Sequence, residues 1–356
     1  MNRTGSKPKN EGRPTVENCG IDLHLKSSEV CVVDEAGEAS ERARIPSTEA
    51  SFRRWFGGRA PMRICIEASG LSPWVARILA ELGHEVIVAN AQRVRLIAES
   101  TLKNDRIDAE TLARLVRMDP ALLCPIRHRR EETQRLRGML RVRRTLVNSR
   151  TACLNTARGL LRSFGYRVPG QRPERLARAL TTAKVPEVLC GLVAPLVATA
   201  LELDEKVQAL DGEVADVGRS FPEVARFQQV PGIGPLVALS YVLCIEDPGR
   251  FRNSRDIPSF LGLRPRMRES AERSHFGSIT RHGDAEMRRL LVQAAHGCLR
   301  SRQDTELKRW AEQLAGRIGK KKAVVALARK LAVLFHRLWV TGEDYEALRT
   351  EVAAAA

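Results

Sequence analysis

The N-terminal part of the chain alternates short apolar segments with compact turns. Three such segments lie within residues 19–45 and are joined by tight turns at 26–29 and 35–37, a pattern that predicts a three-stranded meander. Later segments predict strands at 63–67 and 85–89, alternating with helices at 47–56, 72–82 and 91–100. A meander followed by alternating strands and helices is the layout of a ribonuclease-H-like domain, although unrelated mixed α/β folds share it.

Longer amphipathic segments follow in the middle of the chain. Asn104 or Asp105 caps a helix that is predicted to run to Met118. Residues 131–164 lack proline and predict one long helix rich in arginine, which ends at a break containing glycine and proline, residues 165–173.

Beyond this break, apolar residues recur at heptad spacing and predict a further helix with one apolar seam. The seam residues are Leu192, Leu196, Leu203, Val207, Leu210, Val214 and Val217. Such a seam is typical of a coiled coil or of an antiparallel helix pair. With only about three heptads, an intramolecular hairpin and a dimer zipper both remain open.

The C-terminal third contains a segment with the pattern of a helix-hairpin-helix motif. In residues 229–246 the string PGIG precedes an apolar helix, and Gly232 and Gly234 permit a tight turn. The free N–H groups at the start of such a helix can bind a phosphate, although a plain helix turn has the same pattern. Residues 258–268 form a turn-rich basic stretch.

Two basic helices complete the C-terminal third. The first carries Arg288 and Arg289, and the second is predicted over residues 320–338.

The charge of the chain is strongly positive and unevenly distributed. The sequence has 59 Lys and Arg against 42 Asp and Glu, a formal net charge of +17. Residues 125–175 contain 14 Arg, no Lys and three Glu, whereas the residues before them are close to neutral. The arginine side chain binds phosphate through two parallel hydrogen bonds. A cluster of arginines therefore predicts a nucleic-acid partner.

Other features exclude several classes of protein. No apolar run approaches the ~20 residues of a membrane span, and the polar N-terminus does not resemble a secretory signal. Eight cysteines lie too far apart for CxxC zinc pairs or for a small disulfide scaffold. We therefore expect a cytoplasmic, nucleoid-associated protein with reduced thiols and no membrane partner.

Four acidic residues occupy positions that favour a metal site. Asp22 interrupts an apolar strand, Glu67 ends another strand, and Asp105 and Asp108 lie three apart at the start of a helix. In a ribonuclease-H-like sheet these elements meet, and converging carboxylates require a divalent cation to offset their repulsion. Oxygen ligands select Mg²⁺ or Mn²⁺, which can support phosphoryl transfer.

Each acid also has a simpler interpretation. Asp105 is a natural helix cap, Asp108 a favourable first-turn acid, and Glu67 a partner for a nearby arginine. Asp22 is harder to explain in this way, because an acid between two apolar strand residues needs a partner.

Several motifs together resemble one family of mobile-element proteins. Three segments resemble the three acidic motifs of the DEDD insertion-sequence transposases. They are CGIDLHLKSSEVCVVDEAGE, ICIEASG and LKNDRIDAETLARL. Three later segments resemble parts of the C-terminal transposase domain of the same family. They are VPGIGPLVA, FLGLRPRMRES and GSITRHGDAEMRRLLVQAA. The family is insertion-sequence family one-hundred-and-ten, which includes relatives of the pilin-gene invertase, and the resemblance covers about residues 18–340.

The resemblance implies a fold and a domain order. We expect an α/β RuvC-like (ribonuclease-H-like) domain, a coiled-coil helical linker and a mostly helical C-terminal transposase domain. The predicted boundaries are a disordered tail at 1–17, the DEDD domain at 18–124, the arginine-rich helical region at 125–222, the transposase domain at 223–342 and a tail at 343–356.

The resemblance also implies a mechanism. In this family the acids hold Mg²⁺ beside a C-terminal serine that attacks a DNA phosphodiester and becomes covalently linked to it. A structured bridge RNA pairs with donor and target DNA, and the protein assembles as a homo-oligomer, dimer to tetramer, with active sites shared between protomers.

The nucleophilic serine of the family follows a GLxP motif. That motif here is residues 262–265, so Ser270 is the expected nucleophile. The sequence departs from the family pattern directly after Ser270, where Ala271 replaces the usual glycine, and this leaves Ser274 and Ser278 as alternatives.

Basic residues on several predicted elements are candidates for nucleic-acid contacts, together with the glycines of the PGIG turn. The set comprises Arg137, Arg141, Arg144, Gly232, Gly234, Arg264, Arg266, Arg268, Arg288 and Arg289.

The sequence thus predicts a DNA transposase acting as a serine recombinase, and two other functions remain open. One is a metal-dependent junction endonuclease that needs no serine, and the other is an architectural DNA- or RNA-binding protein without catalysis. The four acids argue against the binding protein, and the C-terminal motifs argue against the endonuclease.

Overall fold

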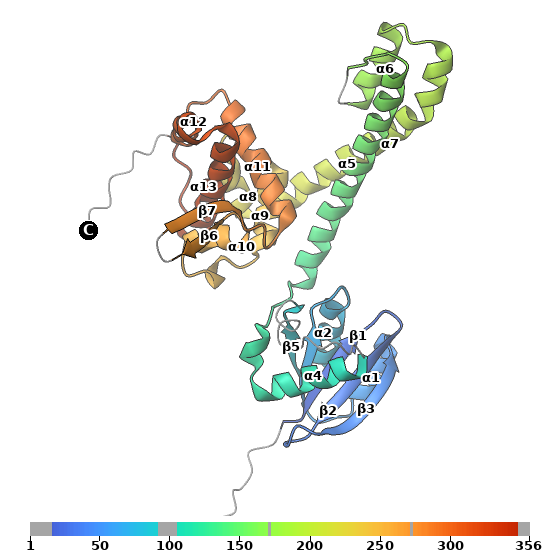
Figure 1. Ribbon diagram of the computed structural model, residues 1–356, viewed down its shortest axis with the longest axis vertical. Coiled ribbons are helices and arrows are strands. Elements are labelled where there is room, and N and C mark those ends of the chain that lie inside the picture. Colours follow the sequence, from blue (N-terminus) through green and yellow to red (C-terminus); the bar gives the residue numbers. More distant parts are fainter. Residues whose placement is uncertain (1–15, 92–104, 170–171, 271–272, 348–356) are drawn as a thin grey trace, which may run out of the picture. The chain divides into compact units, whose positions relative to one another are not determined.

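A computed structural model describes residues 16–91, 105–169, 172–270 and 273–347 of the chain (Figure 1). The chain divides into two compact units, residues 1–129 and residues 130–356. The first has a mixed sheet covered by helices, and the second is mostly helical. In the part of the chain that the structure describes, no helix is both long and apolar enough to cross a membrane.

The first unit contains a five-stranded sheet in the order β3-β2-β1-β4-β5. Its strands are β1 (Asn18–Leu23), β2 (Ser27–Val33), β3 (Ala39–Pro46), β4 (Arg63–Glu67) and β5 (Glu85–Ala89). The first three form an antiparallel meander, whereas β1, β4 and β5 are parallel. The predicted meander and the two later strands are confirmed.

Helices cover both faces of this sheet. The helices α1 (Glu49–Phe56) and α2 (Ser72–Glu81) are amphipathic and pack their apolar sides on Ile64 and Ile66 of β4. On the other face, α4 (Asp105–Met118) packs on Cys65, between those two isoleucines. Successive strand residues point to opposite faces, so the continuous apolar run of β4 is what a strand buried on both sides requires.

Two further elements belong to the first unit. A short 3₁₀ helix, η1 (Pro120–Leu123), follows α4, and its cap is the side chain of Asp119. The helix predicted at 91–100 lies outside the described residues, apart from Ala91.

The second unit begins with a long antiparallel helix pair. The helices α5 (Glu131–Ser163) and α7 (Glu187–Arg219) run side by side, and the chain reverses through α6 (Pro173–Thr182) (Figure 1). Two ion pairs set the register, because Arg143 contacts Asp211 whereas Arg150, further along α5, contacts Asp204, further back along α7. Of the two arrangements that the heptads left open, the intramolecular pair is the one observed.

The predicted seam is correct in the second half of α7, and near the start of the helix it is wrong at Leu192. Val207 and Val214 are buried as predicted, but Leu192 is 51% exposed and the neighbouring Val193 is buried instead. This shift arises from α6, a helix that the sequence pattern did not predict. Because α6 packs against the start of α7, a different row of α7 side chains is buried there.

Six α-helices, two short 3₁₀ helices and a two-stranded sheet make up the described remainder of this unit. They are α8 (Pro222–Gln228), α9 (Pro235–Ile245), α10 (Ile257–Phe260), β6 (Pro265–Ser270), β7 (Arg273–Ile279), α11 (Ala285–Arg300), α12 (Glu306–Ile318) and α13 (Lys320–Thr341), with short 3₁₀ helices η2 (Pro248–Arg250) and η3 (Ser254–Asp256).

An aromatic cluster forms the centre of the C-terminal core. Phe227, Tyr241 and Phe335 are fully buried, and the Tyr241 hydroxyl donates to the Ala332 carbonyl at 2.7 Å. This bond satisfies a polar group inside an apolar core, where an unpaired hydroxyl would be costly. The apolar helix after PGIG is α9, which is buried because it lies in the middle of this core.

Candidate functional site

The first two acids lie on neighbouring parallel strands. Ile21 of β1 is in register with Ile66 of β4, so Asp22 and Glu67 each follow a paired residue at the same edge of the sheet. The Asp22 side chain is 17% exposed, and one carboxylate oxygen, Oδ2, lies 3.0 Å from Nε2 of His24. The carboxylate therefore has a nearby polar partner, as its position in an apolar strand requires.

The helix that carries the other two acids lies directly against the backbone of β1. A Cβ atom placed on Gly20 would lie 2.0 Å from the carbonyl oxygen of Ala109 and 2.5 Å from the backbone nitrogen of Ala113. Only glycine permits this approach. Since Asp108 directly precedes Ala109, the contact fixes the first turns of α4 beside the strand that carries Asp22.

The ligand atoms of this acidic site suit a hard divalent cation. Asp22, Glu67 and Asp108 offer only carboxylate oxygens, and Asp105 begins α4, although its side chain lies outside the described residues. The described side chains do not by themselves form a group of three that could hold a metal ion. Burial, with a smaller contribution from the Glu67 carboxylate, raises the pKa of the neighbouring Cys65 thiol to about 12. Burial therefore favours the protonated form of this thiol.

The expected nucleophile lies at the end of a β-hairpin. The strands β6 and β7 pair antiparallel, with Ser270 opposite Arg273 and Glu269 opposite Ser274. Ser270 is the last residue of β6, and Ser278 is exposed on β7. The basic stretch expected to be rich in turns is therefore partly a strand, because its second half pairs with the segment that follows.

Two glycines interlock at the base of this hairpin. A Cβ atom on Gly262 would lie 1.9 Å from the carbonyl oxygen of His282, and one on Gly283 would lie 2.1 Å from that of Phe260. Both glycines have positive φ values. The Arg288 guanidinium donates to the carbonyls of Leu261 and His282, at 3.0 Å each, and so joins the two loops. These contacts hold the GLRP and RHGD segments side by side.

Three of the candidate nucleic-acid contacts form ion pairs within the protein. Arg137 donates to Asp284 at 2.6 Å, and Arg144 lies 2.7 Å from Glu286, so both join α5 to the start of α11. Arg289 also donates to Glu286. Asp284 is the cap of α11, since it accepts from the Met287 backbone N–H at 2.9 Å.

The remaining candidates differ in how open their surroundings are. Arg141, Arg264 and Arg266 are exposed, whereas the side chain of Arg268 lies outside the described residues. Gly232 has a φ of +86° and lies against the backbone of Gly297, which accounts for a glycine there without any ligand. Gly234 caps α9, and a Cβ placed on it would meet nothing within 4 Å.

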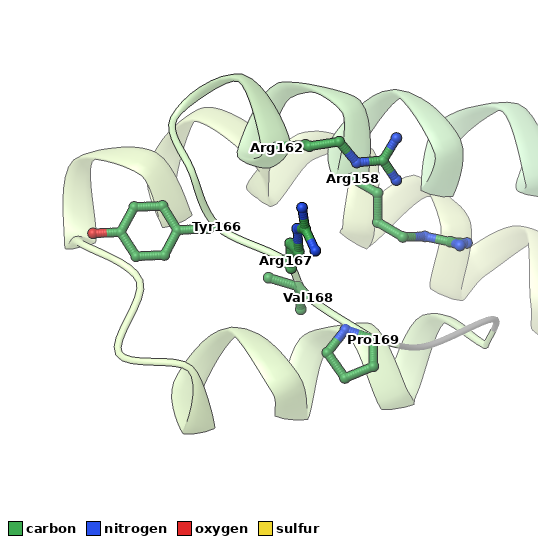
Figure 2. A pocket seen from close by; sticks show the side chains of 6 residues that line it. All are labelled: Arg158, Arg162, Tyr166, Arg167, Val168 and Pro169. Carbon is green, nitrogen blue, oxygen red and sulfur yellow. The ribbon is translucent and has the colours of Figure 1, made fainter.

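A basic pocket that the sequence did not single out lies where α5 ends. It has a volume of about 630 Å³ and is lined by the residues Arg158, Arg162, Tyr166, Arg167, Val168 and Pro169. Figure 2 shows Arg158 and Arg162 projecting from α5, while Arg167 rises from the loop that follows. We call this feature the tip pocket. The arginine content of the segment was visible in the sequence, but not the concave shape, which depends on the loop between α5 and α6.

Two family models match the chain. A model described as "Transposase" matches residues 19–165, and a model described as "Transposase IS116/IS110/IS902 family" matches residues 224–310. The first range contains the four acids, and the second contains the β-hairpin with Ser270. The two matches define the chain as a transposase, an enzyme that cuts and rejoins DNA.

Relatives match over nearly the whole chain. The chain is 31% identical to a probable family 20 transposase of Pseudomonas aeruginosa, over 88% of this chain and 94% of the relative. It is 29% identical to the transposase for insertion sequence element IS1111A of Coxiella burnetii, over 95% of this chain and 94% of the relative. It is also 28% identical to the transposase for insertion sequence element IS1328 of Yersinia enterocolitica, over 90% of this chain and 95% of the relative. The chain belongs to the IS116/IS110/IS902 family of insertion-sequence transposases.

Proposed function

We propose that this transposase cuts and rejoins DNA with a divalent cation held by Asp22, Glu67, Asp105 and Asp108 and with Ser270 as the nucleophile. The observation that carries the proposal is the contact of α4 with Gly20. It sets the helix of Asp105 and Asp108 beside the strand of Asp22, whose parallel neighbour carries Glu67.

The acidic residues support a particular metal chemistry. All four proposed ligands are carboxylates, which favour Mg²⁺ or Mn²⁺ over softer metals. A bound cation would stabilise the charge that develops on the reacting phosphate and on the departing oxygen. Asp22 and Glu67 come from a buried sheet, so their backbone positions are fixed before any metal binds.

The serine step can be written for Ser270. Its oxygen forms a bond to phosphorus, the ester bond between phosphorus and one DNA oxygen breaks, and that oxygen leaves with a proton as a free hydroxyl. Attack of a DNA hydroxyl on the phosphoserine reverses these events and releases the serine. Because the exchange conserves the number of phosphoester bonds, strands can be rejoined without an external energy source.

Guidance by a bridge RNA is part of the proposal, and so is a dimer or tetramer. The support is the similarity to the family together with the low aromatic content of 4%, which limits base recognition by stacking. A protein that leaves sequence recognition to RNA pairing needs backbone contacts more than base contacts.

The test compares excision of a marked element and covalent protein–DNA adducts for Asp22→Asn and Ser270→Ala. We expect both variants to lose excision at least about 1000-fold, as removal of an essential catalytic group does. Both should bind DNA as the wild type does. Ser274→Ala and Ser278→Ala are the matched controls and should keep both excision and adduct.

Each alternative function gives a different result. A metal-dependent endonuclease would lose strand cleavage in Asp22→Asn but not in Ser270→Ala. An architectural binding protein would show no cleavage in the wild type at any Mg²⁺ concentration. An adduct that persists in Ser270→Ala would assign the nucleophile to another residue.

A further inference from the structure

The arginines of α5 differ in their partners along the length of the helix. Near its start and middle most of them pair with acids: Arg135 with Glu132, Arg143 with Asp211 and Arg150 with Asp204. Arg137 and Arg144 pair with acids of the C-terminal core, as described above. Much of the positive charge in this part of the helix is therefore neutralised inside the protein.

The end of the helix is different. Residues 158–184 contain seven basic side chains and one acidic one. Among the residues that the structure describes, none of these seven forms an ion pair with a carboxylate. They are Arg158, Arg162, Arg167, Arg172, Arg175, Arg178 and Lys184. Such a concentration of uncompensated charge raises the free energy of the folded protein, and an anionic partner would remove that cost.

The tip pocket provides a shaped site within this basic region. Arg158 is half-buried and donates its Nε to the Leu154 carbonyl at 3.2 Å, which leaves its terminal nitrogens available for a ligand. Arg162 and Arg167 are exposed. Beneath them a cluster that includes Leu161, Val168 and Leu176 holds the loop in place. The guanidinium groups therefore project from a firm base, which reduces the entropy lost on binding.

The dimensions and lining of the pocket favour a nucleotide unit. Its volume of about 630 Å³ exceeds that of a single phosphate group and falls within the range of small-ligand sites. Guanidinium groups bind phosphate oxygens in pairs, and the apolar surfaces of Val168 and Pro169 suit a sugar or a base. A single carboxylate would satisfy only one of the three arginines.

We infer that the tip pocket binds the phosphodiester backbone of a single-stranded segment of nucleic acid. The inference does not depend on the serine or on the metal site. The concave shape accepts an unpaired nucleotide more readily than the regular backbone of a duplex, and the other basic residues of 158–184 extend the contact to neighbouring phosphates.

The experiment measures the affinity of the full chain for labelled single-stranded DNA and RNA of equal length, at several salt concentrations. The test variant replaces Arg158, Arg162 and Arg167 with Gln. The matched control replaces three exposed arginines that do not line the pocket, Arg54→Gln, Arg219→Gln and Arg309→Gln, and so changes the net charge equally. Circular dichroism and the urea midpoint check that both variants fold.

We expect the test variant to bind at least 10-fold more weakly at moderate salt and the control less than 3-fold more weakly. For a single strand each lost phosphate contact lowers the salt slope by about 0.7, so the slope should fall by about 2. Replacement of the same three residues with Lys should restore part of the affinity, since charge is kept but paired hydrogen bonding is lost.

The comparison of DNA with RNA shows which nucleic acid supplies the phosphodiester backbone that the pocket binds. A loss confined to RNA assigns the pocket to RNA, a loss confined to DNA assigns it to DNA, and an equal loss assigns it to the shared phosphodiester chemistry. Equal weakening by test and control variants would overturn the inference. It would also be overturned if nucleic-acid affinity were unchanged while sedimentation showed a loss of self-association, because the partner would then be an acidic surface of a second copy.

Discussion

At the scale of single residues, Gly20 determines whether the acids can meet. The backbone of α4 occupies the space that any side chain at this position would need. The sequence placed Asp22 and Glu67 on strands because an acid within or at the end of an apolar strand is conspicuous. It could not show the role of Gly20, because nothing near that glycine indicates where a helix almost ninety residues later will pass.

Gly20→Ala should therefore separate the two halves of the acidic site. We expect a loss of about 1–3 kcal/mol in the free energy of unfolding, the usual cost of overpacking, because α4 must move away from β1. Cleavage should also fall, although every acid is intact. Urea denaturation measures the free energy of unfolding, and strand cleavage followed over a Mn²⁺ titration measures the loss of activity. Gly58→Ala is the control, since a Cβ there would meet nothing within 4 Å, and it should change neither quantity.

At the scale of elements, buried charge fixes the register of the α5 and α7 pair. Asp204 is buried and its side chain is 8% exposed, with Arg150 on one oxygen and Gln208 donating to the other at 2.8 Å. The periodicity of apolar residues predicted the pair, but the register also depends on such polar contacts. The shift near Leu192 arises from α6, whose ten residues are too few for a strong periodic signal.

Removal of Arg150 should test this contribution. Arg150→Ala leaves a buried carboxylate without its cation, so we expect a loss approaching about 3 kcal/mol in the free energy of unfolding. The double variant Arg150→Ala with Asp204→Asn should recover much of that loss, because the unpaired charge is gone. As a comparison, Arg135→Ala removes an exposed pair with Glu132 and should leave the urea midpoint nearly unchanged. Equal effects of Arg150→Ala and Arg135→Ala would contradict this account.

At the scale of the whole molecule, most of the net positive charge is separated from the acidic site along the chain. Of the net charge of +17, +14 lies in residues 130–356, whereas the four acids lie in residues 1–129. Composition predicted this separation directly, because counting charges needs no knowledge of the fold. The distribution of partners among the arginines was not predictable, since it depends on which acids fold back against them.

Chelation should therefore separate binding from catalysis. With EDTA present, we expect strand cleavage to disappear while nucleic-acid affinity changes less than about 3-fold, because the proposed binding residues are not metal ligands. Gel shift and cleavage assays on the same samples measure both quantities. A large loss of affinity on chelation would mean that the metal also holds the nucleic acid. Restoration by Mg²⁺ or Mn²⁺ but not by Ca²⁺ would identify a catalytic rather than a structural role.

The equal lengths of α5 and α7 constrain how this protein can change by insertion and deletion. Each helix has 33 residues, which corresponds to a rod about 50 Å long at 1.5 Å per residue. Residues gained in one helix alone would misalign Arg143 with Asp211 and expose apolar surface. Length variants that keep the fold must therefore gain or lose residues in both helices together, and each added heptad would carry the tip pocket about 10 Å further outward.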